Sequence, residues 1–196
     1  MKTARKALML ILCAALLVSA TVMGTLAYLT SQTEVVTNTF TVGNVKITLD
    51  EAKVTVYGVK DGDTRVIEND YKLIPGHTYV KDPIVHVTAG SEKCWLFVKV
   101  TDDIATIQDT TTVAAQMEAN GWTAVADAED VYAYASIVDA GTAAKDVKVF
   151  ENFKIKGDAD VAAYAGKTIT IQAYAIQADG FASAGAAWEA APTDWQ

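Results

Sequence analysis

Apolar and polar residues alternate in short runs along most of the chain, which is the pattern of half-buried β-strands. One run extends from Thr39 to Leu49, and its phase breaks at Gly43-Asn44, which suits a bulge or a bend. Val54 to Val59 form a second run. The Asp-Gly within residues 60–63 supplies the left-handed positions of a hairpin turn, so we expect the return strand to begin at Val66.

A second region combines turn residues with apolar runs. Pro75-Gly76 predicts a tight turn before a strand from Thr78 to Val87. Pro83 has no amide hydrogen, so this strand is expected at a sheet margin or with a bulge. Residues Cys94 to Thr101 are at first apolar on both faces, as in a strand of a sandwich interior.

The remaining pattern predicts two short helices and further strands. Thr112 to Gly121 break the alternation and predict a helix with Val113, Met117 and Ala114 facing inward. The Ala-rich run Ala182 to Ala190 predicts a closing helix before Pro192. The other expected strands are Val131 to Ser136, Ala144 to Phe150 and Lys167 to Ile176, the last with Ile169, Ile171, Ala173 and Ala175 on one face. About eight short strands with turns between them predict an all-β antiparallel sandwich.

The N-terminus has the features of a secretory signal peptide. Lys2, Arg5 and Lys6 form a positive region, residues 7–22 are apolar, and Thr25-Leu26-Ala27 offers the small residues that a signal peptidase recognises. We therefore expect cleavage between Ala27 and Tyr28. A retained membrane anchor is the competing interpretation, but the apolar run is short for a span of about 20 residues.

The charge and cysteine content of the cleaved chain exclude several partners and an intrachain disulfide. Removal of residues 1–27 takes away three positive charges and changes the formal net charge from -8 to -11. Such an acidic surface repels nucleic acid and anionic membranes, so we expect neither as a partner of the mature chain. Cys94 would be the one remaining thiol, which excludes an intrachain disulfide. We expect it to be a buried small hydrophobic residue.

Three separated segments resemble one family of exported proteins. They are MGTLAYLTSQTEVVTNTFTVGNVKITLDE (residues 23–51), LIPGHTYVKDPIVHVTAGSEKCWLFVKV (73–100) with its Pro-Gly-x-x-x-x-Lys-Asp-Pro pattern, and ITIQAYAIQADGF (169–181). They are similar to the TasA/camelysin-type proteins of Gram-positive bacteria, which depend on the signal peptidase SipW. The resemblance implies a jelly roll and a role in biofilm matrix fibres that are built by donated N-terminal strands. Camelysin-type relatives are described as metalloproteases.

The sequence lacks the common catalytic motifs, so it does not predict an enzyme. The two histidines, His77 and His86, are not part of a His-Glu-x-x-His zinc motif, so we expect His77 to be a solvated loop residue and His86 an outward strand residue. The chain also lacks a Gly-x-Ser-x-Gly elbow and a phosphate-binding Gly-Lys loop. We expect no catalytic residue, no metal site and no cofactor.

Acidic and aromatic residues offer weaker candidates for binding. The acidic pairs Asp61/Asp63, Asp102/Asp103 and Asp158/Asp160 could bind calcium, but none has the spacing of an EF-hand, and solvated turn carboxylates are the simpler expectation. A sugar-binding face could use Tyr71, Tyr79, Trp95, Trp122, Tyr132 and Tyr134. Their positions within predicted strands favour packing in the core.

The segment behind the signal peptide is the best candidate for function. Tyr28 to Leu49 would extend over roughly 70 Å, which is more than one strand of a compact sandwich needs. Its first part is polar and β-branched, and Val35 and Val36, followed by Phe40 and Val42, provide apolar anchors. It could act as a donor strand for a neighbouring copy. Pairing with its own sheet or an unordered N-terminus are the alternatives.

These observations predict a secreted subunit that forms homopolymeric fibres in an extracellular matrix or at the cell surface. We expect a signal peptide (1–27), a donor arm with the first strand (28–49), and a jelly-roll body (50–196) that forms one domain with residues 39–49. Expected partners are other copies, matrix or anchoring proteins, and the signal peptidase during export; the membrane is a partner only before cleavage. The alternatives are a monomeric module that binds wall polysaccharide or a matrix or host protein, and a metalloprotease.

Overall fold

A computed structural model describes residues 5–6, 9–14, 44–192 and 195 of the chain. The chain divides into two compact units, Met1–Thr41 and Val42–Gln196. In the first unit, residues 5–6 and 9–14 are helical. Within the described residues, no helix combines the length and the apolar composition needed to cross a membrane.

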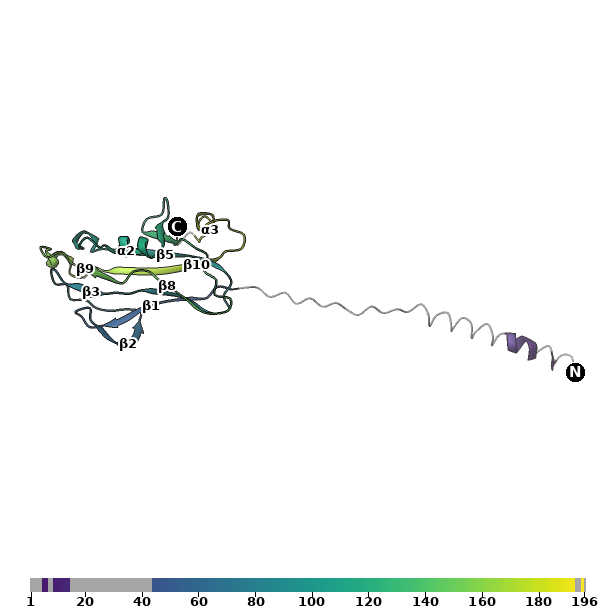
Figure 1. The fold of residues 1–196 in the computed structure, drawn as a ribbon. Helices are drawn as coiled ribbons and strands as arrows, with labels where there is room; N and C mark the ends of the chain where they lie inside the picture. The colour runs from purple at the N-terminus through teal and green to yellow at the C-terminus, as the bar shows by residue number, and fades with distance from the viewer. Residues whose placement is uncertain (1–4, 7–8, 15–43, 193–194, 196) are drawn as a thin grey trace. The chain divides into compact units, whose positions relative to one another are not determined.

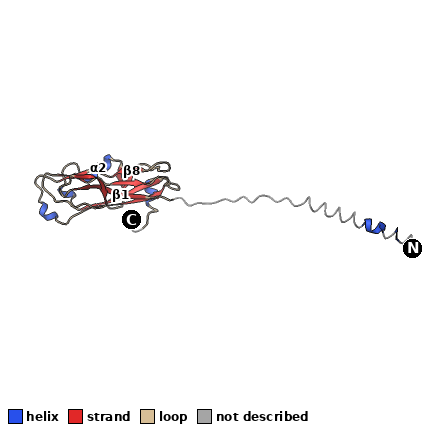
Figure 2. Cartoon of the chain, turned by 90° about the horizontal axis from the view of Figure 1, so that it is seen from below, coloured by secondary structure: helices blue, strands red, loops and turns tan. Residues whose placement is uncertain are grey.

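The second unit is a body of short strands with a few helical turns, as Figures 1 and 2 show. Its described strands are β1 (Ile47–Val54), β2 (Lys60–Val66), β3 (Thr78–Val80), β4 (Ile84–Val87), β5 (Cys94–Asp102), β6 (Trp122–Ala124), β7 (Val131–Tyr134), β8 (Lys145–Lys148), β9 (Asn152–Lys154) and β10 (Ile169–Gln177). The helical turns are η1 (Ala105–Ile107), α2 (Val113–Ala119), η2 (Val161–Tyr164) and α3 (Ala184–Trp188). The predicted all-β class is confirmed.

The strands form two four-stranded antiparallel sheets and a small third sheet. The orders are β2-β1-β4-β8 and β10-β5-β7-β6, and β3 pairs with β9. The two larger sheets lie as layers in Figure 1, with β1 and β8 in one layer and β5 and β10 in the other. Side chains from both layers form one buried core. The body is therefore an antiparallel sandwich.

Strand β5 is buried on both faces, as its sequence predicted. Leu96 and Val98 point into the core between the sheets. Phe97 and Trp95 point to the outer face, where they pack with Trp188 of α3 in a second apolar cluster. Both faces are apolar because each is covered by another layer.

Strand β10 also follows its predicted pattern. It pairs with β5 over its whole length, from Ile169 opposite Asp102 to Gln177 opposite Cys94. The four residues predicted to share a face all pack against the core between the sheets: Ile169, Ile171, Ala173 and Ala175. The strict alternation of apolar and polar residues in this strand was enough to predict which of its side chains face the core.

The predicted hairpin turn at residues 60–63 is wrong. These residues lie in β2, and the chain turns earlier, where Thr55 N–H donates to Val59 O at 2.8 Å. Gly58 makes this turn possible, since its φ is +70° and a Cβ there would lie 2.6 Å from Tyr79 Cα. Gly62 has a φ of +76°, but it lies where β2 shifts register against β1. The Asp-Gly pair thus forms a bulge.

The predicted strand Thr78 to Val87 is divided into β3 and β4, and Pro83 lies in the break. Its expected place at a sheet margin is wrong, because β4 lies between β1 and β8. Pro83 precedes the strand, so its missing amide hydrogen costs no bond of the ladder. The turn at Pro75-Gly76 is confirmed, with His77 N–H donating to Ile74 O at 3.2 Å.

The two predicted helices are present but short. In α2, the side chain of Thr112 caps the helix by accepting from Ala115 N–H, and Val113 and Met117 are buried. Ala114 is exposed, so its predicted inward position is wrong. Helix α3 ends before Pro192 as expected. Strands β6 and β9, three residues each, carry too little alternation to be predicted from the sequence.

Candidate functional site

A groove of about 910 Å³ opens between the two sheets on the side of β1 and β10. One wall consists of β1 and the segment 66–73 after β2, and the other consists of residues 161–168 and the start of β10. Apolar residues from both walls line it, among them Leu49, Leu73, Phe153, Tyr164, Ile169 and Ile171. The groove is therefore a place where the core between the sheets reaches the surface.

The apolar wall of the groove belongs to an edge strand. Among the described residues, β10 pairs with β5 alone. An antiparallel edge strand directs every second pair of N–H and C=O groups away from its neighbour. Ile169 and Ile171 face the core but remain only half-buried. This edge thus offers both main-chain hydrogen-bonding groups and apolar side chains.

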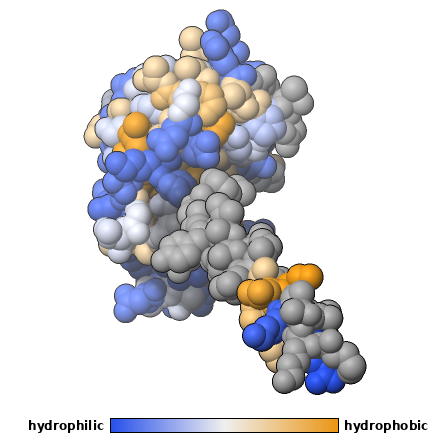
Figure 3. All heavy atoms as spheres, turned by 90° about the vertical axis from the view of Figure 1, so that its right-hand side faces the viewer, coloured by the Kyte–Doolittle hydropathy of each residue, from blue (hydrophilic) through white to orange (hydrophobic). Residues whose placement is uncertain are grey.

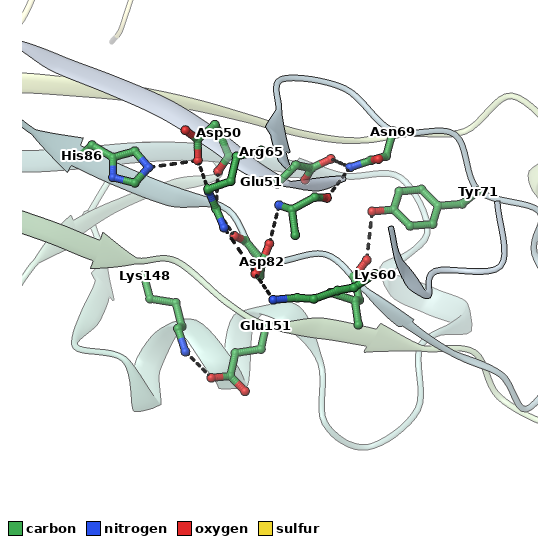
Figure 4. Close-up of polar contacts among 12 residues, drawn as sticks. Asp50, Glu51, Lys60, Arg65, Asn69, Tyr71, Asp82, His86, Lys148 and Glu151 are labelled. Atoms are coloured by element: carbon green, nitrogen blue, oxygen red, sulfur yellow. Dashed lines mark hydrogen bonds and ion pairs between the residues drawn. The ribbon is translucent and has the colours of Figure 1, made fainter. Parts of the chain in front are cut away.

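The other end of the groove is polar. Lys81 Nζ lies 2.6 Å from Glu51 Oε2, and both residues are buried, at 8% and 5% exposure. Asn69 Nδ2 donates to the second oxygen of the same carboxylate, Glu51 Oε1, at 2.9 Å; Figure 4 draws this contact. One carboxylate therefore joins an amine and an amide from two different segments.

The Asn69 side chain also acts as a partner for the backbone of β1. Its Oδ1 accepts from Val54 N–H at 2.9 Å, and its Nδ2 donates to Ala52 O at 2.9 Å. The ladder between β1 and β2 shifts register between these two residues of β1. The amide satisfies backbone groups where the bulge interrupts the ladder, and this fixes its position beside Glu51.

A second charged network covers the outer face of the same sheet. Arg65 donates to the Asp50 carboxylate and, through Nη2, to Asp82 O at 3.0 Å. His86 bridges two carboxylates, with Nε2 at 2.9 Å from Asp50 and Nδ1 at 2.6 Å from Asp146. Figure 4 shows Asp50 between the side chains of His86 and Arg65.

The protonation of this network follows from its contacts. Partial burial alone would lower the pKa of His86, but the two carboxylates outweigh it and raise the pKa above its ordinary value. For Asp50, burial opposes ionisation, and the hydrogen bonds from Arg65 and His86 outweigh it and lower the pKa. The network therefore favours the protonated form of His86 and the ionised form of Asp50.

The described histidines do not form a metal site. Both ring nitrogens of His86 contact carboxylates. His77 lies in a loop, as expected, but it is half-buried: its Nε2 lies 2.9 Å from Tyr57 O, and its ring packs against the ring of Tyr79. Among the described residues, no group of three or more His, Cys, Asp or Glu side chains could hold a metal ion. This part of the chain does not fit a zinc peptidase centre.

Other candidate residues have structural roles. Cys94 is fully buried, in agreement with the expected buried hydrophobic residue, and burial raises its pKa to about 11. The aromatic residues proposed for a sugar-binding face pack in the core, with Tyr79 at 0% and Trp122 at 1% exposure. Asp102 accepts from Ile104 N–H and Asp160 accepts from Ala162 N–H, as turn carboxylates do.

The predicted assembly and cleavage residues are not placed by the structure. Ala27, Tyr28, Val35, Val36, Phe40 and Val42 lie outside the described residues. The described part of the first unit exposes Arg5 and Lys6 together with apolar side chains from Met9 to Leu12. Figure 3 colours the exposed residues by hydropathy, hydrophilic in blue and hydrophobic in orange.

The residues at the polar end of the groove were not predicted from the sequence. Glu51 is a charged residue within a strand, and Lys81 belongs to the Lys-Asp-Pro pattern in the segment 73–100. Burial of both could not be predicted, because they are thirty positions apart and meet only through the fold.

The sheets and the groove define an antiparallel β-sandwich protein with one open side. Residues 2–79 match the family model described as camelysin metallo-endopeptidase. This match confirms the predicted resemblance of the N-terminal part of the chain to TasA/camelysin-type proteins. No curated protein and no solved structure matches the chain.

Proposed function

We propose that the protein is a secreted structural subunit of an extracellular matrix or surface fibre, and that it has no enzymatic role. In this proposal, the arm behind Ala27 of one copy occupies the groove of the next copy. The observation that carries the proposal is the groove beside the edge of β10.

The chemistry of the groove suits an added strand. The edge of β10 offers main-chain groups for a ladder, and Ile169 and Ile171 offer half-buried apolar contacts. Val35 and Val36 in the arm would supply the matching side chains, and Phe40 and Val42 would extend them. A strand added beside β10 would cover apolar surface at about 25 cal/mol per Å² in addition to its hydrogen bonds.

This contact would produce a polymer and not a closed dimer. The arm and the groove are different surfaces, so each copy can donate one arm and receive another. Removal of residues 1–27 would free the arm and leave a chain with a formal net charge of -11. Repulsion between such chains opposes unspecific aggregation, so that assembly depends on the fitted strand. The jelly roll implied by the family resemblance belongs to this same proposal.

Truncation of the arm tests the proposal directly. A chain that starts at Tyr28 is concentrated beside a chain that starts at Thr39, and both are examined by electron microscopy and size-exclusion chromatography. We expect regular fibres from the longer chain and monodisperse particles from the shorter one. Equal polymerisation of the two chains would contradict strand donation.

Two substitutions in β10 test the receiving groove. Ile171→Glu places a charge on the groove wall, whereas Gln172→Glu adds the same charge at the adjacent exposed position. We expect Ile171→Glu to abolish fibres and Gln172→Glu to retain them, with both monomers folded by circular dichroism. Fibres of ordinary length from Ile171→Glu would exclude this groove as the acceptor.

A monomeric binding module is the second candidate. The polar end of the groove, with Glu51, Asn69 and Lys81, could recognise hydroxyl or amide groups of a wall polysaccharide or an extended peptide. Particles that stay monodisperse at every concentration and bind such a ligand would favour this function. Protease activity that a chelator abolishes, and that His77→Ala or His86→Ala removes, would instead support the activity in the name of the matched family.

A further inference from the structure

Three side chains at the polar end of the groove have the arrangement of an acyl-transfer centre. Lys81 Nζ carries a potential nucleophile, the Asn69 side chain carries a carboxamide, and Glu51 contacts both groups. The distances are 2.6 Å from Glu51 Oε2 to Lys81 Nζ and 2.9 Å from Glu51 Oε1 to Asn69 Nδ2. The amine and the amide therefore contact the two oxygens of one carboxylate.

The surroundings of the amine favour its reaction. Lys81 is 8% exposed and Glu51 is 5% exposed, so water has little access to either. The described contacts of the amine are the Glu51 carboxylate and the ring of Tyr71, whose centroid lies 5.9 Å away. A buried ion pair of this kind is weak evidence for a stabilising role, because desolvation of both charges offsets their attraction. Proton transfer from the Lys81 ammonium to the Glu51 carboxylate would neutralise both groups.

Hydrogen bonds position the Asn69 carboxamide for nucleophilic attack at Cγ. Asn69 Oδ1 accepts a hydrogen bond from Val54 N–H at 2.9 Å, and this donor would stabilise negative charge on the oxygen during attack. Nδ2, the leaving nitrogen, points to Glu51 Oε1. The carboxyl group that takes a proton from the amine is thus in contact with the nitrogen that must receive one.

We propose that Lys81 and Asn69 become joined by an intramolecular isopeptide bond, with Glu51 as the catalytic acid-base residue. Glu51 takes a proton from the Lys81 ammonium, and the neutral amine attacks Asn69 Cγ. Glu51 returns the proton to Nδ2 as the Cγ–Nδ2 bond breaks, and the remaining extra proton on the attacking nitrogen passes to the released ammonia. The ammonium and the carboxamide become a secondary amide and an ammonium ion, so the step needs no oxidant, cofactor or external energy source.

The bond would close a covalent loop over residues 69–81. This loop contains Leu73, which lines the groove, and it connects the segment after β2 with the end of β3. The cross-link would hold one wall of the groove in place in a protein whose predicted mature form has no disulfide. The inference does not depend on strand donation, because the reaction takes place within one copy.

Mass spectrometry of the intact, folded chain tests the proposal. We expect a mass lower than that of the sequence by one ammonia. Trypsin cleaves after Arg65, Lys72 and Lys93, so a digest should contain peptide 66–72 joined to peptide 73–93, with no cleavage at Lys81. A folded chain with the full sequence mass, and with the two peptides separate, would overturn the proposal.

Variants distinguish the cross-link from cyclisation of Asn69 onto the backbone of the Asn69-Asp70 step, which also releases ammonia. Lys81→Arg keeps the charge but removes the nucleophile, and Glu51→Gln keeps the shape but removes the proton carrier. We expect both variants to have their full sequence mass, while the surface control Lys93→Arg retains the loss of ammonia. Loss of ammonia from Lys81→Arg would overturn the cross-link, and bond formation at an unchanged rate in Glu51→Gln would exclude the role of Glu51. If a variant does not fold, the peptide map of the unsubstituted chain decides.

Discussion

Substitution of two glycines by alanine tests how the turn between β1 and β2 supports the wall of the groove. Gly58 and Gly62 have nearly the same left-handed backbone, with φ values of +70° and +76°. They differ in their surroundings. A Cβ at Gly58 would lie 2.6 Å from Tyr79 Cα and 2.8 Å from Tyr79 Cβ, whereas nothing lies within 4 Å of a Cβ at Gly62.

The comparison isolates the cost of the close contact. A left-handed alanine costs about 1–2 kcal/mol at either position, and the lower entropy of the unfolded chain offsets about 0.4–1 kcal/mol of it. These contributions cancel between the two variants because the φ values match. Overpacking against Tyr79, which is fully buried and stacked on Phe153 with centroids 4.9 Å apart, adds about 1–3 kcal/mol at Gly58 alone. Gly58→Ala should therefore be less stable than Gly62→Ala by about 1–3 kcal/mol.

Urea unfolding of both variants, monitored by tryptophan fluorescence, measures this difference. In a parallel thermal unfolding experiment on a body of this size, the midpoint of Gly58→Ala should lie about 2–12 °C below that of Gly62→Ala. Similar slopes of the unfolding curves would show that the unfolded states are comparable. Equal midpoints for the two variants would refute the inference that the turn packs directly on Tyr79.

Two further predictions concern titratable groups. His86→Gln should lower the free energy of unfolding by under about 1 kcal/mol near pH 5, because the network is partly exposed. The same substitution should have a smaller effect near pH 9. The folded pKa of His86 is raised above 6.5, so its stabilisation is fully present below that value and is lost as the pH rises through the folded pKa; an equal effect in urea unfolding at both values would contradict the network. In a chain carrying Cys13→Ser, Cys94 should not react with a thiol reagent at pH 8 until urea unfolds the body, because burial raises its pKa to about 11; rapid labelling of the folded chain would contradict this.

Local sequence patterns determined the elements whose side chains need no distant partner. The alternation of residues 167–176 was sufficient to assign the core face of β10, and Thr112 and Gly121 were sufficient to bound α2. The Asp-Gly of residues 61–62 was misassigned because a left-handed glycine serves a bulge as well as a turn. The actual turn depends on contact between Gly58 and Tyr79, which no local pattern contains.

Predictions about the site divide in the same way. The expected burial of Cys94 followed from its apolar neighbours and is confirmed. The contact between Glu51 and Lys81 joins β1 to the residue after β3, and these two strands belong to different sheets, so no local pattern contains it. The assembly residues of the arm stay a prediction, since they lie outside the described residues.

The two ends of the groove place different demands on the chain. At the apolar end, the edge of β10 that faces away from β5 has no strand partner among the described residues, and its isoleucines are half-buried, which lowers the stability of the isolated body. At the polar end, Glu51 and Lys81 must be desolvated, which also costs free energy unless the charges are removed. A bound strand would restore the stability that is lost at the open edge. A covalent bond would remove the desolvation penalty of the charged pair. Both destabilising features line the same groove between the sheets. We therefore expect the function of the protein at this groove more than at any other described surface.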